Sequence, residues 1–229
     1  NCAKNTVVTA PTGVAAVNCG GVTLHSLFQL PIGTYIPAMT TAFQAAGNQV
    51  IDKHSLFRNL RLGREKIKLF NSLELLIIDE VSMLRADALD AVDAILRRVR
   101  KNFHTPFGGL QVLFIGDLFQ LPPVVKEAEW ALLQPYYTTP FFYDALVLQQ
   151  EPPVCIELEK IYRQTDDLFI GLLNRVRGNE ATDEDFATLR QFYRPGFNVP
   201  PGENYITLTT HNKSADEINR HELEKLPCH

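Results

Sequence analysis

The stretch "LELLIIDEVSML", residues 73–84, sets five apolar side chains before two adjacent carboxylates, Asp79 and Glu80. A short run that is apolar on both faces is typical of a strand buried in a parallel sheet. In wound α/β sheets the carboxyl ends of the strands open into the crevice where ligands bind. The stretch therefore indicates either an acidic pair at a ligand-binding edge or a strand that ends in polar turn residues, and alone it favours neither.

A second run, "LQVLFIGDLFQLPPV" at residues 110–124, repeats this form with Gly116, Asp117 and Gln120 after the apolar segment. Glycine allows a sharp turn at the strand end, and a glutamine amide can donate to a phosphate oxygen and accept from a water. Mg²⁺ prefers one or two carboxylates together with phosphates and waters. An acid beside the metal ligand can act on the attacking water, because phosphoanhydride hydrolysis depends on positioning and charge stabilisation. The two runs together favour a nucleotide-hydrolysing site over a structural coincidence.

The remaining pattern predicts a wound α/β fold with a parallel sheet, because apolar strand-like runs alternate with helical ones. Further strands are expected at residues 5–10, 154–158 and 205–209, and an amphipathic helix on the sheet at 85–100. Residues 31–57 show no sustained period and are punctuated by proline and glycine, so we expect an insertion or long loop rather than core. Other helices are expected over residues 64–73, 166–179, 183–196 and 211–226.

The composition is that of a globular protein, with 229 residues, 45% hydrophobic residues and a net charge of −4. The negative charge argues against a surface that attracts nucleic acid as a whole, so any polyanion site must be local. The basic runs at 58–68 and 97–101 are candidates, although such runs are more often solvated helix faces. No stretch reaches the roughly 18 apolar residues of a membrane helix, and no signal-peptide pattern opens the chain. We therefore expect an intracellular protein, located in the cytoplasm of a prokaryote or virus, or in the nucleus or mitochondrion of a eukaryote. Its four cysteines are scattered along the sequence, so we expect them to be reduced and mostly buried.

Five segments resemble, in order and spacing, successive motifs of the PIF-type (petite integration frequency) DNA helicases, superfamily-one motors related to the RecD and Dda helicases. These segments are "VVTAPTGVAAVNCGGVTLHSLFQLPIG", "LLIIDEVSML", "GGLQVLFIGDLFQLPPV", "LEKIYRQTDDLFIGLLNRVRGN" and "ITLTTHNKSADEINRHELEKL". The resemblance implies an incomplete RecA-like P-loop NTPase motor domain over residues 1–153. It further implies linker helices and the start of a second RecA-like domain over 154–229. Residues 31–66 would form a wedge-type insertion.

The same resemblance implies ATP and Mg²⁺ as cofactors and assigns roles in hydrolysis. Asp79 would bind Mg²⁺, Glu80 would activate the water, and Gln120 would sense the γ-phosphate. Arg163 would reach the transferring phosphate, where a fixed guanidinium stabilises charge; an ordinary ion pair with Glu157 or Glu159 is the alternative. The catalytic residues are then Glu80, Gln120 and Arg163, and the nucleotide-binding set is Asp79, Glu80, Asp117, Gln120 and Arg163.

By resemblance, the partners are single-stranded DNA and duplex junctions, and a monomer is expected. Small and hydroxyl-bearing residues early in the chain can approach a phosphate backbone closely, and a histidine can stack on a nucleotide. The DNA-binding residues implied are Thr9, Pro11, Thr12, Gly13, Thr23, His25 and Ser26, with Thr210 and Asn212 from the second motor domain.

The sequence departs from the family because it contains no GxxxxGK[ST] loop, which cradles phosphates and neutralises them with its lysine. We expect the chain to begin just after that loop and to be inactive alone, although part of an ATP-dependent 5′-to-3′ DNA helicase. The alternatives are a non-catalytic DNA- or partner-binding module derived from a helicase, and another P-loop ATPase.

Overall fold

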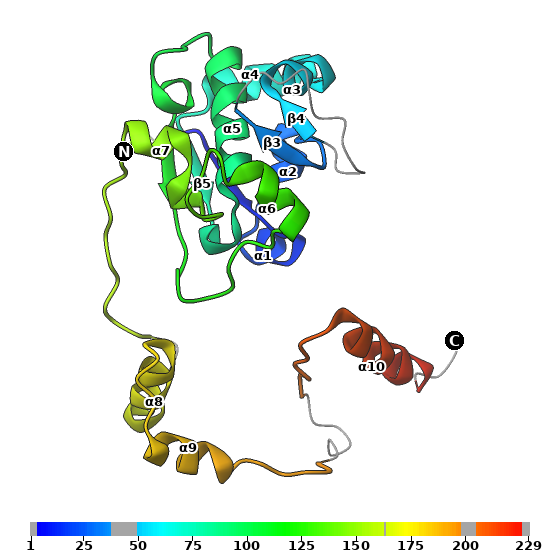
Figure 1. The fold of residues 1–229 in the computed structure, drawn as a ribbon, viewed down its shortest axis with the longest axis vertical. Helices are drawn as coiled ribbons and strands as arrows, with labels where there is room; N and C mark the ends of the chain where they lie inside the picture. Colours follow the sequence, from blue (N-terminus) through cyan, green and yellow to red (C-terminus); the bar gives the residue numbers. More distant parts are fainter. Residues whose placement is uncertain (1–3, 38–49, 163, 198–204, 226–229) are drawn as a thin grey trace. The chain divides into compact units, whose positions relative to one another are not determined.

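The computed structural model describes residues 4–37, 50–162, 164–197 and 205–225 (Figure 1). The chain divides into two compact units, Asn1–Gln164 and Thr165–His229. The boundary predicted after residue 153 rests on motif resemblance and stays a prediction. Within the described ranges no helix is long and apolar enough to cross a membrane.

The centre of the first unit is a four-stranded sheet in the order β2 (Val22–Thr23), β1 (Thr6–Ala10), β5 (Leu75–Ile78) and β6 (Gln111–Phe114). All three strand pairs are parallel. The predicted strands at 5–10, 73–79 and 110–116 are therefore confirmed, as is the α/β class. Thr9, Ile78 and Phe114 stand in register, so these three strands end together at one edge.

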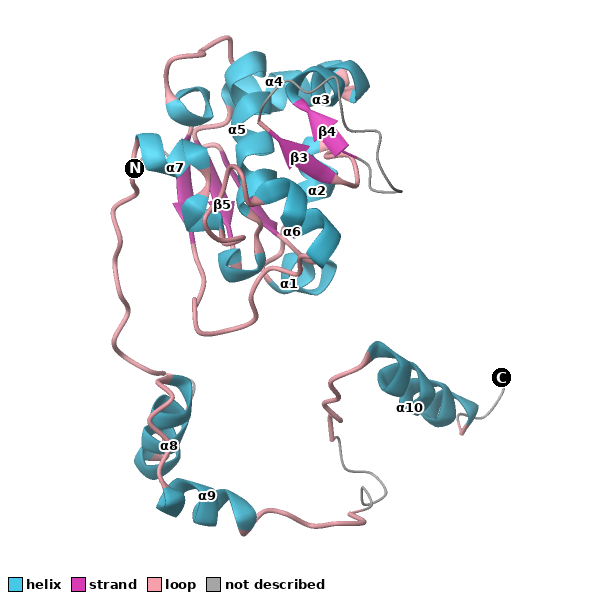
Figure 2. Cartoon of the chain, viewed as in Figure 1, coloured by secondary structure: helices cyan, strands magenta, loops and turns pink. Residues whose placement is uncertain are grey.

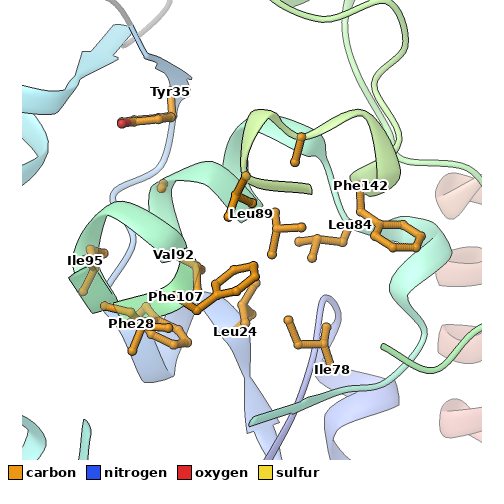
Figure 3. Close-up of a cluster of buried hydrophobic side chains, with 14 of the residues drawn as sticks. Leu24, Phe28, Tyr35, Ile78, Leu84, Leu89, Val92, Ile95, Phe107 and Phe142 are labelled. Atoms are coloured by element: carbon orange, nitrogen blue, oxygen red, sulfur yellow. The ribbon is translucent and has the colours of Figure 1, made fainter. Parts of the chain in front are cut away.

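Helices of the first unit lie mainly to one side of this sheet (Figure 2). α5 (Ala86–Val99) is the long amphipathic helix predicted at 85–100, and it buries Leu89, Val92, Ile95 and Leu96 in the main core. Figure 3 shows side chains of α5 gathered with Leu24, Phe28, Ile78 and Phe107 from other elements. The other helices of this unit are α1 (Gly13–Asn18), α2 (Leu24–Phe28), α3 (Lys53–Asn59), α4 (Arg64–Ser72), α6 (Glu127–Leu133) and α7 (Leu146–Gln150), with 3₁₀ turns η1 (Val81–Met83), η2 (Pro106–Gly109) and η3 (Phe142–Asp144).

The expectation that residues 31–57 lie outside the core was wrong for their described part. β3 (Thr34–Ile36) and β4 (Val50–Asp52) form a two-stranded parallel sheet. Tyr35, Ile51 and Leu56 are buried in the main hydrophobic cluster. The two strands of three residues are too short to show a period in the sequence. β3 packs against α5, and β4 packs against β3 and α3. Residues 38–49 lie outside the described residues.

The second unit holds α8 (Asp167–Arg177), α9 (Asp183–Arg190) and α10 (Asn212–Glu224), as predicted. Asp166 caps α8 by accepting from the backbone N–H groups of residues 168 and 169, and Gly178 ends it. The Arg175 Nε donates to Asp185 at 2.8 Å, which ties α8 to α9 and holds the pKa of that carboxyl below its usual range.

The strands predicted at 154–158 and 205–209 were wrong: both segments are irregular. Val154, Ile156 and Leu158 are 81–90% exposed. Since a strand needs a neighbour for its backbone hydrogen bonds, and none of the described strands pairs with these segments, apolar composition alone does not form one. Cys19 and Cys155 are both free thiols, but Cys155 is exposed, which corrects the expectation of burial for that residue.

Candidate active site

Asp79 directly follows β5 at the edge where the central strands end. Its backbone N–H donates to the carbonyl of Thr9 at 2.8 Å. Its carboxylate accepts from the backbone N–H of Glu80 at 2.9 Å. The next residue, Val81, donates to the carbonyl of Ile115 at 3.0 Å. The acidic pair is therefore fixed between β1 on one side and the continuation of β6 on the other.

Glu80 has left-handed backbone geometry, with φ 51° and ψ 41°. For a residue with a Cβ this conformation costs about 1 kcal/mol, and such outliers gather at functional sites. The turn ends the strand and starts η1, with the Met83 N–H donating to the Glu80 carbonyl at 3.2 Å. Both acids are half-buried at the sheet edge as a result.

The end of β6 lies directly against this turn. The Ile115 N–H donates to the carbonyl of Ile78 at 2.9 Å. A Cβ on Gly116 would stand only 2.9 Å from the backbone nitrogen of Val81, so glycine is required for this close approach. The two predicted strand ends are thus adjacent in space.

Asp117 positions Gln120 on the loop that follows. One carboxylate oxygen accepts from the Phe119 N–H at 3.0 Å, and the other accepts from the Gln120 side-chain amide at 3.3 Å. The Gln120 N–H also donates to the Asp117 carbonyl at 3.0 Å. Gln120 is exposed, so the loop presents its amide to solvent with its orientation set by Asp117.

The carboxylates of Asp79 and Glu80 suit Mg²⁺ better than a metal ion whose ligands all come from the protein. Within the described residues, no group of three or more histidines, cysteines or acids could hold a metal ion, and no ion pair involves Asp79 or Glu80. Mg²⁺ takes one or two carboxylates and fills its shell with phosphates and waters. The Ser82 hydroxyl, in η1, is fully buried and has no hydrogen-bond partner, an orphan polar group beside the acids. Arg163 lies outside the described residues, so its role stays a prediction.

Three predicted DNA-binding residues line one pocket of about 240 Å³: Pro11, Thr12 and His25, together with Tyr35 and Arg85. Partial burial lowers the pKa of His25, and the nearby charge of Arg85 lowers it further. The imidazole is therefore neutral at pH 7, which suits stacking or hydrogen bonding rather than a charge contact.

The other predicted DNA contacts are placed less uniformly. Thr9 is fully buried, and its hydroxyl donates to the Ile77 carbonyl at 3.0 Å inside the sheet, so we leave it out of the proposed DNA path. Thr12 and Thr23 cap α1 and α2 with their hydroxyls, at 3.3 and 3.2 Å. Gly13, Ser26, Thr210 and Asn212 are exposed, the last two in the second unit.

Sequence reasoning missed the cluster of Arg85, Asp87 and Glu129. Arg85 forms a bidentate pair with Asp87 at 2.8 Å and reaches Glu129 at 3.1 Å. Asp87, which is 2% exposed, also accepts from the Tyr35 N–H at 3.0 Å. The cluster joins the start of α5 to β3 and α6. Its only sequence signal was the acid in the first turn of the predicted helix, and an acid is common there because it interacts favourably with the helix dipole.

The basic run at 58–68 is partly structural. Lys66 donates from Nζ to the carbonyls of Ser26 and Leu27 at 2.7 and 3.0 Å and so covers the end of α2. This cation stabilises the fold.

The comparison with family models matches residues 1–168 to "PIF1-like helicase". The chain belongs to the PIF1-like helicase family. It is 34% identical to the ATP-dependent DNA helicase PIF1 of Saccharomyces cerevisiae, covering 98% of this chain and 23% of the relative. It is 33% identical to the human ATP-dependent DNA helicase PIF1, covering 97% of this chain and 30% of the relative. The chain therefore spans less than a third of these two proteins.

Solved structures agree. A Bacteroides Pif1 helicase in complex with ADP-AlF3 and ssDNA is 38% identical, with a TM-score of 0.83, covering 100% of this chain and 49% of that chain. The Pif1 helicase from Candida albicans is 28% identical, with a TM-score of 0.76, covering 97% of this chain and 44% of that chain. The RecA-like fold expected from the motifs is confirmed.

Proposed function

We propose that this chain is part of an ATP-dependent DNA helicase, which couples ATP hydrolysis to 5′-to-3′ movement on single-stranded DNA and to duplex separation. The observation that carries this proposal is the placement of Asp79–Glu80 and Asp117–Gln120 after adjacent parallel strands at one sheet edge. Family membership favours a helicase over another class of P-loop ATPase.

Each residue at this edge has a chemical task suited to its type. Asp79 would hold Mg²⁺, which when bound neutralises charge on phosphate oxygens. The Glu80 carboxylate orients the attacking water and accepts its proton. The Gln120 amide, held by Asp117, donates to a phosphate oxygen. Arg163 completes the proposed set as the cation that stabilises charge on the transferring phosphate.

The proposed DNA path comprises the surface around Pro11, Thr12 and His25. Their hydroxyl and ring groups suit phosphate and base contacts without sequence selection. The Bacteroides relative, whose structure contains ssDNA, supports this partner. The full proposed set is Pro11, Thr12, Gly13, Thr23, His25 and Ser26, with Thr210 and Asn212 in the second motor domain. We also propose a monomeric, intracellular protein with a wedge-type insertion at about 31–66.

The test is strand separation by the longer protein that carries this chain. Partial duplexes with a 5′ or a 3′ single-stranded tail are offered with ATP and Mg²⁺. We expect displacement of the 5′-tailed substrate, dependent on ATP. Equal displacement of both substrates would overturn the polarity, and ATP-independent binding without displacement would favour a non-catalytic module.

A further inference from the structure

A cavity of the first unit has neither Asp79 nor Glu80 among its lining residues. It measures about 950 Å³ and lies between α3, α5 and α7, with Lys53, Phe57 and Arg58 on the α3 side. Arg97 and Arg98 line the α5 side. We call it the α3–α5 groove. None of its lining residues belongs to the proposed ATP or DNA-contact sets.

The groove is positive in a chain whose net charge is −4. Four cations line it, Lys53, Arg58, Arg97 and Arg98, against two acids, Asp90 and Asp93. Within the described residues, none of the ion pairs involves Lys53, Arg58 or Arg98.

The two acids already have partners. Asp93 binds Arg97 Nε at 2.7 Å and accepts from the Phe107 N–H at 2.6 Å. Asp90 is buried, and accepts from the Tyr137 hydroxyl at 2.8 Å and from the backbone N–H groups of residues 146 and 147. Their oxygens are satisfied by the fold, so the positive side chains set the character of the opening.

Aromatic side chains stand among these cations. Phe103 is 60% exposed, and its carbonyl accepts from Arg97 at 2.8 Å, which fixes the loop that carries it. The Arg98 guanidinium lies over the Phe57 ring, 4.4 Å from its centroid. Cations interleaved with a presented aromatic ring are the arrangement that binds single strands, with phosphates on the cations and bases on the rings.

We propose that the α3–α5 groove binds single-stranded nucleic acid, with Lys53, Arg58 and Arg98 at the phosphates and Phe103 beneath a base. The proposal rests on the proposed function and adds a second contact to its DNA path. Tyr35 lines both this groove and the smaller pocket of Thr12 and His25, so the two sites share a wall.

The experiment measures the binding of a fluorescent oligothymidylate to the chain by anisotropy, over a range of salt concentrations and without ATP. In Lys53→Gln/Arg58→Gln, two phosphate contacts are lost. The slope of log K against log salt then falls by about 1.4, and binding weakens about 25-fold at about 0.1 M salt. Phe103→Ala weakens binding at least about fivefold without changing the slope.

The matched control is Lys160→Gln/Arg190→Gln, a lysine and an arginine on exposed positions outside the groove and outside the basic runs. It should change binding less than about twofold, and circular dichroism verifies that all variants fold. Unchanged affinity and slope in Lys53→Gln/Arg58→Gln would overturn the proposal.

Two further arms test the ligand. If the groove variants bind a hairpin duplex more weakly than wild type but bind the oligothymidylate unchanged, the single-strand assignment is wrong. If millimolar inorganic phosphate displaces the oligonucleotide, the groove is a site for free phosphate. If the groove variants bind DNA as well as wild type and the longer protein unwinds DNA with ATP, only the groove proposal is refuted. If binding depends on the groove but the longer protein does not unwind DNA with ATP, only the proposed function is refuted.

Discussion

Gly116→Ala tests whether the close contact between β6 and the acidic turn holds the site. The added Cβ would lie 2.9 Å from the Val81 nitrogen, 3.1 Å from Val81 Cγ1 and 3.3 Å from the Ser82 nitrogen. Two of these atoms are backbone and cannot rotate away. Since ordinary contact starts at 3.4 Å, the turn must move by roughly 0.5 Å. Such overpacking costs about 1–3 kcal/mol of unfolding free energy.

The same shift displaces Glu80, the residue before Val81. A displacement of about 1 Å can cost about 100-fold in rate, so we expect kcat for ATP to fall about tenfold in the longer protein. Urea unfolding of the chain and steady-state ATPase measure the two effects. Gly63→Ala is the control, because no atom lies within 4 Å of its added Cβ, and it should change stability by less than about 1 kcal/mol. A Gly116→Ala protein with unchanged stability and kcat would refute the packing argument.

Three other predictions follow from individual residues. Burial raises the pKa of Asp90 from 3.8 to about 6, so the contribution of the protonated carboxyl to stability is complete below about pH 4 and is lost by about pH 6. Measured by urea unfolding, Asp90→Asn should therefore gain up to about 3 kcal/mol relative to wild type between these pH values. Parallel plots of unfolding free energy against pH for the two proteins would contradict this. Asp87→Ala leaves the Tyr35 N–H without its partner and Arg85 with Glu129 alone, and should cost about 3 kcal/mol by urea unfolding. A loss under about 0.5 kcal/mol would show the cluster to be unimportant. The 229-residue chain alone, which has no GxxxxGK[ST] loop, should show no DNA-stimulated phosphate release in a colorimetric assay; turnover that Glu80→Gln abolishes would prove this wrong.

The central sheet was predictable because its strands are mostly apolar along their whole length and carry their own signal. The burial on both faces that such runs suggest is not seen, since Leu76 and Ile78 are buried whereas Leu113 is 45% exposed. Apolar runs ended at Asp79 and Asp117, and the parallel register brought those ends together. The burial of Thr9 was not predictable from the sequence. The segment implied to contact DNA contains both surface residues and residues inside the sheet, and only the strand register shows that Thr9 lies inside.

Other elements depend on partners distant in the sequence. Tyr35 is a core residue because α5 packs against β3, and Ile51 lies beside it on β4. Their short strands show no period in the sequence. Conversely, Ile156 and Ile206 belong to apolar runs that look like strands, yet both are more than 80% exposed and unpaired among the described strands. The composition of a segment gives it a tendency to form a strand, but whether a strand forms depends on a neighbouring strand to pair with.

The central claim is that Glu80 acts on the water that attacks ATP. The most direct measurement compares Glu80→Gln with Glu151→Gln, an exposed control outside the acidic turn, in the longer protein with single-stranded DNA. We predict that Glu80→Gln lowers kcat at least about 100-fold while ATP affinity stays within about threefold, and that Glu151→Gln changes neither. An unchanged kcat in Glu80→Gln would contradict the account.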